Sequence, residues 1–189
     1  MSLPNFSSYV QALAAVPFRE VSFGSSTVRI FDSNQIDEAQ LGYSRDSNGQ
    51  SLCGRKDGDW KDEWLVIAYE DLCGDPIFID TSVNNMPVYT AMHGQGRWEP
   101  ELIADTFDGF VESLKAVKSV AAGRENPVEL ESNPLPNAQC EQILKTIRVA
   151  NPKADTAFWY LWLNQDDSYV GRMRLVVHSC REFLRRILR

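Results

Sequence analysis

The segment from His93 to Trp98, His-Gly-Gln-Gly-Arg-Trp, comes closest in residue type to a catalytic loop. A histidine followed by spaced glycines could build an oxyanion hole or cradle a phosphate. An esterase loop of this kind works with a G-x-S-x-G nucleophile elbow, and the chain contains none. A dinucleotide loop needs a third glycine where Glu99 stands, and a carboxylate there would repel pyrophosphate. The phosphate-binding pattern G-x-x-x-x-G-K-[ST] is also absent.

We therefore predict that His93 is a turn residue whose ring bonds a neighbouring carbonyl, and that Trp98 closes over a sheet edge. Two other pairs are compatible with chemistry: Asp75 with Asp80 as acid and base, and Cys73 with His93 as nucleophile and base. Paired acids beside a hairpin are more often turn residues. Cys73 ends an apolar strand and shows no sign of thiolate activation. The sequence predicts a protein that is not an enzyme and holds no cofactor.

The cysteines are spread along the chain without a CxxC pair, at Cys53, Cys73, Cys140 and Cys180. Together with two histidines they offer no pair at zinc-ligand spacing, so no metal site is expected. This usage predicts reduced thiols in a cytoplasmic protein. The first residues lack a basic n-region and meet Pro17 early, which is unlike a signal peptide. No run approaches the ~20 apolar residues of a membrane span.

Charge is distributed unevenly in this chain of net charge −7. Residues 172–189 hold six arginines and one glutamate, a net of +5, so the remainder carries −12. Residues 57–80 hold eight acids and one base. A field of that sign repels nucleic acid and anionic membranes and favours a basic partner. Arg181, Arg185 and Arg189 lie at i, i+4 spacing; they either complement a helix dipole or form a second contact surface.

The acidic stretch supplies the predicted contact surface for a protein partner. Its residues are Asp57, Asp59, Asp62 and Glu63 before a strand, and Glu70, Asp71 and Asp75 around the next turn. Because interfaces concentrate binding energy in aromatic side chains, Trp60 is the predicted anchor, in preference to Trp64. The alternative is a set of solvated turn residues with no partner.

Hydrophobic periodicity and turn residues predict the elements that position these residues. We expect a helix over 5–16, a strand pair over 20–32, a short helix over 33–43 and an exposed loop over 44–63. Three antiparallel strands should follow within 64–72, 75–80 and 86–92. A helix is expected to begin at residue 103, with Asp105 or Thr106 as its N-cap. A linker at 123–136 should follow, and then three helices over 137–149, 152–163 and 169–188.

One stretch is similar to a known family. The segments WLVIAYEDLCGDPIFID, PVYTAMHGQGRW and IADTFDGFVESL resemble the signature of the SUKH superfamily, which includes yeast cell-wall-assembly-regulator-like domains and bacterial immunity proteins. The matching positions are Ile67, Ala68, Gly74, Asp75, Asp80, Pro87, Val88, Tyr89, His93, Ile103, Ala104, Thr106, Phe107, Phe110 and Leu114, with Trp98 closing the second segment. The resemblance covers residues 60–118, with a weaker echo at 28–43. The glycines of the family's opening helix are missing, and no family motif follows residue 125.

The resemblance implies a single α+β domain with a twisted, mainly antiparallel sheet and helices packed around it. A SUKH-like core would span 1–122, and a C-terminal helical segment, 137–189, would pack on it. One core cluster is expected, formed by Ile67, Ile77, Ile79, Val88, Phe107, Phe110 and Leu114.

The implied function is non-catalytic: binding and neutralising a cognate polymorphic toxin of nuclease or deaminase type, as a monomer or weak dimer. A regulatory or scaffold protein for an endogenous partner is the competing class. A small-ligand site near His93 and Trp98 is a third, which an apolar pocket would reveal.

Overall fold

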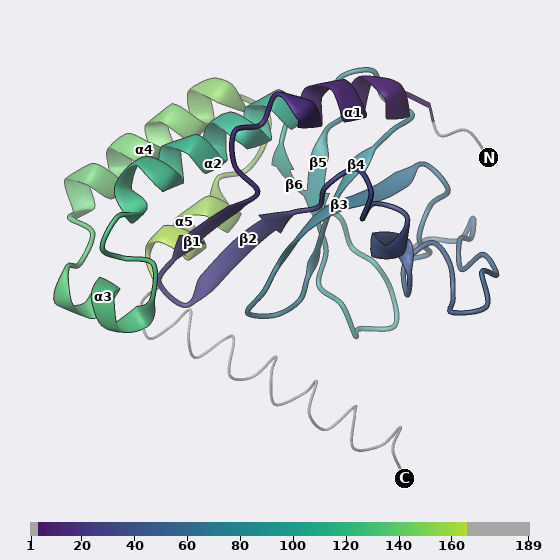
Figure 1. The fold of residues 1–189 in the computed structure, drawn as a ribbon, viewed down its shortest axis with the longest axis horizontal. Coiled ribbons are helices and arrows are strands. Elements are labelled where there is room, and N and C mark those ends of the chain that lie inside the picture. The colour runs from purple at the N-terminus through teal and green to yellow at the C-terminus, as the bar shows by residue number, and fades with distance from the viewer. Residues whose placement is uncertain (1–3, 166–189) are drawn as a thin grey trace, which may run out of the picture.

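Six strands pair in the order in which they occur along the chain, so each lies beside its sequence neighbours in one antiparallel sheet (Figure 1). The computed structural model describes residues 4–165. The strands are β1 (Glu20–Phe23), β2 (Ser26–Ile30), β3 (Trp64–Glu70), β4 (Pro76–Asp80), β5 (Val88–Thr90) and β6 (Glu101–Ala104). The helices are α1 (Phe6–Ala14), α2 (Phe107–Ala121), α3 (Pro127–Ser132), α4 (Asn137–Ala150) and α5 (Ala157–Leu163), with a short 3-10 helix, η1 (Glu38–Gln40). The predicted single α+β domain is confirmed.

Helices α1, α2, α4 and α5 contribute their apolar stripes to one large core against one face of the sheet (Figure 1). Successive residues of a strand point to opposite faces, so alternate positions of the central strands enter this core. All seven residues predicted to share a cluster do so: Ile67, Ile77, Ile79, Val88, Phe107, Phe110 and Leu114. The hydrophobic periodicity therefore identified the main core correctly.

The start of α2 corrects one sequence prediction. Ile103 and Ala104 belong to β6, the sixth strand, rather than to the following helix. Thr106 is the N-cap, and its hydroxyl accepts a hydrogen bond of 2.8 Å from the Gly109 N–H. The helix begins at Phe107 because this cap satisfies a backbone donor that has no partner within the helix.

The C-terminal part of the described chain closes the β6 edge. Trp159 of α5 is buried, and its indole N–H donates to the Ile103 carbonyl over 2.8 Å. An edge strand with free carbonyls invites pairing with other chains, and this contact occupies one of them. Helix α5 begins at Ala157, later than predicted, while the stretch expected as a linker contains the short helix α3. The predicted helix over 169–188 and its arginines lie outside the described residues.

Gln165, the last described residue, is tied to the β1–β2 turn. Its side-chain amide donates to the Phe23 carbonyl over 2.7 Å, and its oxygen accepts from the Ser25 N–H over 2.7 Å. Gly24 in this turn has a φ of 59°, which favours glycine, and a β-carbon there would lie 2.1 Å from the Gln165 oxygen. The turn and the end of α5 are therefore joined through side-chain contacts.

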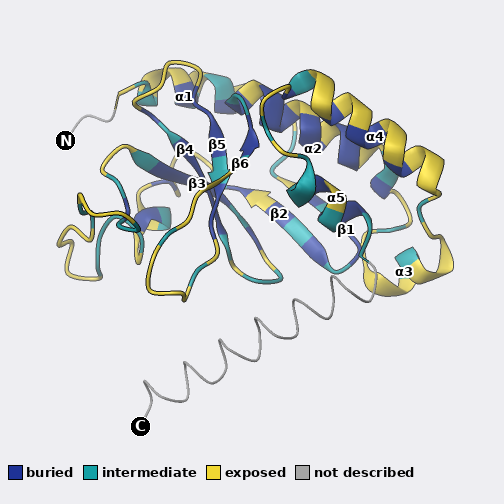
Figure 2. Ribbon diagram, turned by 180° about the vertical axis from the view of Figure 1, so that it is seen from behind, coloured by how far each residue is buried: buried dark blue, intermediate teal, exposed yellow. Residues whose placement is uncertain are grey.

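The second face of the sheet is covered by loops instead of helices. Its own cluster contains Trp60, Val66, Phe78 and Ala91, with Tyr43, Trp64, Tyr89 and Trp98 packed around them. Figure 2 shows these loops as largely intermediate and exposed segments beside the buried strands. The candidate site lies on this second face, around Trp64 at the start of β3, which the loops leave partly exposed.

Candidate partner-binding surface

The predicted acidic residues separate into two groups at opposite ends of β3. Asp57, Asp59, Asp62 and Glu63 precede the strand, whereas Glu70, Asp71 and Asp75 surround the β3–β4 turn. Seven extended residues span roughly 20 Å, so the two groups do not form one surface. The β3–β4 hairpin also lies between β2 and β5, away from either edge of the sheet. The acidic residues of the predicted contact surface are therefore divided between the two ends of β3.

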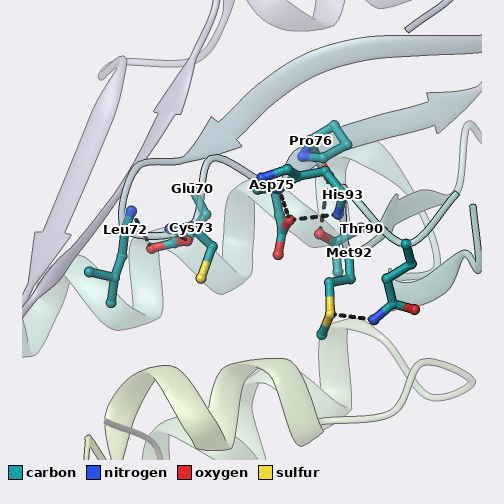
Figure 3. A network of polar contacts seen from close by, with 9 residues as sticks. Glu70, Leu72, Cys73, Asp75, Pro76, Thr90, Met92 and His93 are labelled. Carbon is teal, nitrogen blue, oxygen red and sulfur yellow. Dashed lines mark hydrogen bonds and ion pairs between the residues drawn. The ribbon is translucent and has the colours of Figure 1, made fainter. Parts of the chain in front are cut away.

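Glu70 is a structural residue, which corrects its prediction as a partner contact. The side chain is buried and accepts hydrogen bonds from the backbone N–H groups of Leu72 and Cys73, at 3.0 and 2.9 Å (Figure 3). The Ser26 hydroxyl of the neighbouring β2 donates to the same carboxylate. Burial raises the pKa of Glu70 above its ordinary value, although these hydrogen bonds oppose the shift. Asp71 also bonds the β1–β2 hairpin, by accepting from the Thr27 N–H over 2.7 Å.

Asp75 clamps the segment that follows β5. One of its carboxylate oxygens accepts from the His93 backbone N–H over 3.0 Å and lies 2.7 Å from the ring Nδ1 (Figure 3). The His93 ring thus bonds a carboxylate where a carbonyl was predicted. Gly74 just before Asp75 has a φ of 75°, which lets the chain turn into β4. A carboxylate on Nδ1 fixes the orientation of a histidine ring. We interpret the contact as a clamp between two turns.

The group before β3 remains open to solvent. The Asp57 side chain is 93% exposed and lies 3.6 Å from Arg97. Asp62 and Glu63 are exposed. Asp59 instead closes its own loop, by accepting from the Lys56 N–H over 2.8 Å. Arg97 and Lys56 lie close to these acids, and Arg55 is next to Lys56 in sequence. The surface before β3 is therefore less negative than the charge count of residues 57–80 indicated.

Trp60 is unavailable to a partner, which corrects the predicted anchor. Its side chain is only 1% exposed and packs against Tyr43, Trp64, Phe78 and Trp98 with ring centroids 4.8 to 5.3 Å away. The ring packs between the loops and the sheet with Val66, Phe78 and Ala91. Trp60 therefore stabilises the loop cover.

Trp98 also differs from its prediction as a cover for the sheet edge. Its ring packs on Trp60 and Tyr43, and its backbone N–H donates to the Gly58 carbonyl over 2.8 Å. The loop after β5 is thereby joined to the loop before β3. The loop before β3 and the loop after β5 thus pack against each other through the rings of Trp60 and Trp98.

Trp64, and not the predicted anchor Trp60, is partly exposed, as is Trp98. Trp64 lies directly opposite Asp80 across the β3–β4 pair. Both side chains point to the loop-covered face, because Val66 and Phe78 two residues away do so. Tyr89 of β5 lies opposite Phe78 and is also partly exposed. The apolar run WLVIAYE contains no polar alternation that could have distinguished its exposed positions from its buried ones.

Comparisons with protein-family models, curated proteins and solved structures found no match to this chain. Between residues 4 and 165, no cluster of three or more His, Cys, Asp and Glu side chains is placed to hold a metal ion. Over the same residues, none of the helices combines the length and apolar character required to cross a bilayer. The site is therefore interpreted from its own geometry.

Proposed function

We propose that this protein is a non-catalytic binding protein that neutralises a cognate bacterial toxin of nuclease or deaminase type. The SUKH-like motifs within residues 60–118 support an immunity function, and the charge of the domain supports a basic partner. Residues 4–165 hold 23 acidic and 13 basic side chains, a net charge of −10. Enzymes that act on nucleic acid present cationic surfaces to phosphates, and an acidic protein can bind the same surfaces.

The observation that carries this proposal is the exposure of Asp62 and Glu63 beside Trp64, at the uncovered end of the sheet face. The Glu63 carbonyl accepts from both the N–H and the hydroxyl of Thr81, at 2.9 and 2.8 Å. These bonds hold the end of the loop against the chain after β4. A contact surface that is already ordered loses less entropy on binding.

Co-expression with a nuclease or deaminase toxin from an adjacent gene, which an immunity function requires, tests the proposal by cell survival. The wild-type chain should protect cells, whereas the triple variant Asp57→Lys, Asp62→Lys, Glu63→Lys should protect poorly. Charge reversal slows association and removes the salt dependence of binding.

The matched control reverses three exposed helix positions, Glu112, Glu131 and Glu141, and changes the net charge equally. Full protection by this control, with loss in the loop variant, would support the surface. Absence of protection by the wild-type chain would refute the neutralising function. Equal protection by both triple variants would place the contact elsewhere on the protein.

A further inference from the structure

Trp64, Asp80 and Tyr89 lie together on the uncovered part of the sheet face. Trp64 and Asp80 are directly opposed, so their β-carbons are about 5 Å apart. The Phe78 ring lies 4.9 Å from the Trp64 ring and 5.8 Å from the Tyr89 ring, which places these two on either side of it. Burial and then the charge of Asp80 raise the pKa of Tyr89, consistent with their proximity. The Asp80 carboxylate thus lies beside the partly exposed Trp64 and diagonal to the partly exposed Tyr89.

The Asp80 carboxylate accepts hydrogen bonds from Ser82, through one of its two oxygens. Oδ1 accepts from the Ser82 N–H over 2.9 Å and from its hydroxyl over 2.6 Å. No lysine or arginine of residues 4–165 forms an ion pair with Asp80. Within the same residues the cation–π contact is between Lys118 and Phe18, in the helical layer. Within residues 4–165, the oriented and partly exposed Asp80 carboxylate therefore lies next to two aromatic rings and forms no ion pair with a lysine or arginine.

We propose that Trp64, Asp80 and Tyr89 form a recognition site for an arginine side chain of a basic protein partner. This inference rests on the proposed function and names the chemistry of the contact. A guanidinium is planar, stacks on aromatic faces and donates to a carboxylate through a fixed fork. A lysine ammonium is more strongly hydrated and cannot stack in the same way, so the site should prefer arginine. Phosphate groups would be repelled by Asp80 and the adjacent Asp62 and Glu63.

Binding of nona-arginine and nona-lysine peptides to the full chain, measured by calorimetry, tests the site without a known partner. Wild type should bind nona-arginine several-fold more tightly than nona-lysine. Asp80→Asn should weaken nona-arginine binding about ten-fold, because a charge-assisted hydrogen bond is lost. The asparagine oxygen can still accept from Ser82, so the fold should be preserved. Trp64→Leu should abolish the preference for arginine over lysine.

The controls separate a site from general electrostatic attraction. Asp71→Asn removes the same charge at the opposite end of β3, and Tyr160→Leu removes an exposed ring in α5. Both should leave binding within about two-fold of wild type, which is the range of a distant charge change. Equal losses for Asp71→Asn and Asp80→Asn, or equal binding of the two peptides to wild type, would overturn the proposal.

The chain's own arginines, in residues 172–189, are the competing occupant. A full-length variant with these six replaced by glutamine should bind both peptides more tightly because it is more acidic, with the same ratio of nona-arginine to nona-lysine affinity as wild type. A ratio that rises in this variant would assign the site to the chain itself and overturn a partner contact.

The survival assay with the toxin can fail for the arginine contact without failing for the proposed neutralising function. Protection that is lost in Asp80→Asn and Trp64→Leu supports the arginine contact. Protection that these variants retain, with the loop triple variant still defective, overturns the arginine contact and leaves the proposed function standing.

Discussion

Gly109 of α2 and Asn151 after α4 approach so closely that a β-carbon at Gly109 would lie 2.2 Å from the Asn151 side-chain oxygen. That oxygen accepts from the Asp105 N–H over 3.0 Å, just before α2 begins. The Asn151 amide donates to Ser113 Oγ over 2.9 Å and to the carbonyls of Gly109 and Ile147, each over 3.2 Å. One buried amide therefore joins α2 to α4 and to the chain leaving β6.

Asn151→Ala should destabilise the fold by roughly 2–4 kcal/mol, because buried donors and acceptors lose their partners. Urea unfolding measures the loss. Asn133→Ala is the control, since Asn133 is exposed and its bonds are near the surface. A loss below about 1 kcal/mol for Asn151→Ala would mean that water replaces the amide.

Gly109→Ala should also destabilise, because its new methyl group collides with the Asn151 amide. The cost should be smaller in an Asn151→Ala background, although the Ala150 carbonyl would still lie 3.1 Å from the methyl carbon. A double-mutant cycle measures this coupling. Additive losses would show that the close approach relaxes without strain.

Truncation of Phe107 or Phe110 to alanine should cost about 3–5 kcal/mol, the range for a buried aromatic ring. Both side chains are at most 1% exposed, and Phe110 packs 6.0 Å from the Trp159 ring. Chemical denaturation measures the change, with Tyr160→Ala, half exposed in α5, as the control. Equal small losses at all three positions would be incompatible with this core.

The ionisation of Glu70 should make stability fall as pH rises above the ordinary carboxyl pKa of 4.5. Burial raises the folded-state pKa, so the folded protein retains a proton that the unfolded chain releases. The contribution is complete below pH 4.5 and is lost as pH approaches the raised pKa. The slope for one proton is at most about 1.4 kcal/mol per pH unit.

Glu70→Gln should remove that slope, so the stability difference between wild type and variant should shrink as pH rises. Urea unfolding at a series of pH values measures the difference, and other carboxylates cancel in it. A difference that is constant with pH would show that Glu70 titrates normally.

His93→Ala should leave toxin protection intact and cost about 1 kcal/mol of stability, the value of one hydrogen bond. The variant loses, among its contacts, the 2.7 Å ring bond to Asp75, while the backbone N–H of residue 93 can still donate. The survival assay and urea unfolding provide the two readouts. Loss of protection in a variant that stays folded would restore His93 as a catalytic or contact residue.

Thiol titration of the denatured, non-reduced protein should count four free cysteines. In the folded protein Cys140 should react slowly because it is 4% exposed, and burial raises the pKa of its thiol. Cys53 and Cys73 are partly exposed and should react sooner. Fewer than four thiols in denaturant would indicate a disulfide and contradict the predicted reducing compartment.

Local sequence patterns were sufficient for most elements, because strand alternation and helix capping depend on neighbouring residues. The apolar run from Trp64 to Leu72, bounded by turn residues, predicted β3, and Thr106 was one of the two N-cap candidates for α2. The short strand β6 was missed because four residues carry too little periodicity. Its pairing with β5 distinguishes Ile103 and Ala104 from a first helical turn.

The candidate site depended on contacts between distant positions, which a local pattern does not contain. Trp60 and Trp64 are four residues apart with the same side chain, yet packing by Tyr43 and Trp98 buries Trp60 alone. Glu70 became structural because Ser26, 44 positions earlier, bonds it across the sheet. The sequence by itself determined an acidic antiparallel domain. Tertiary structure decided which acids and which tryptophan reach solvent, because burial depends on what the rest of the chain packs above each side chain.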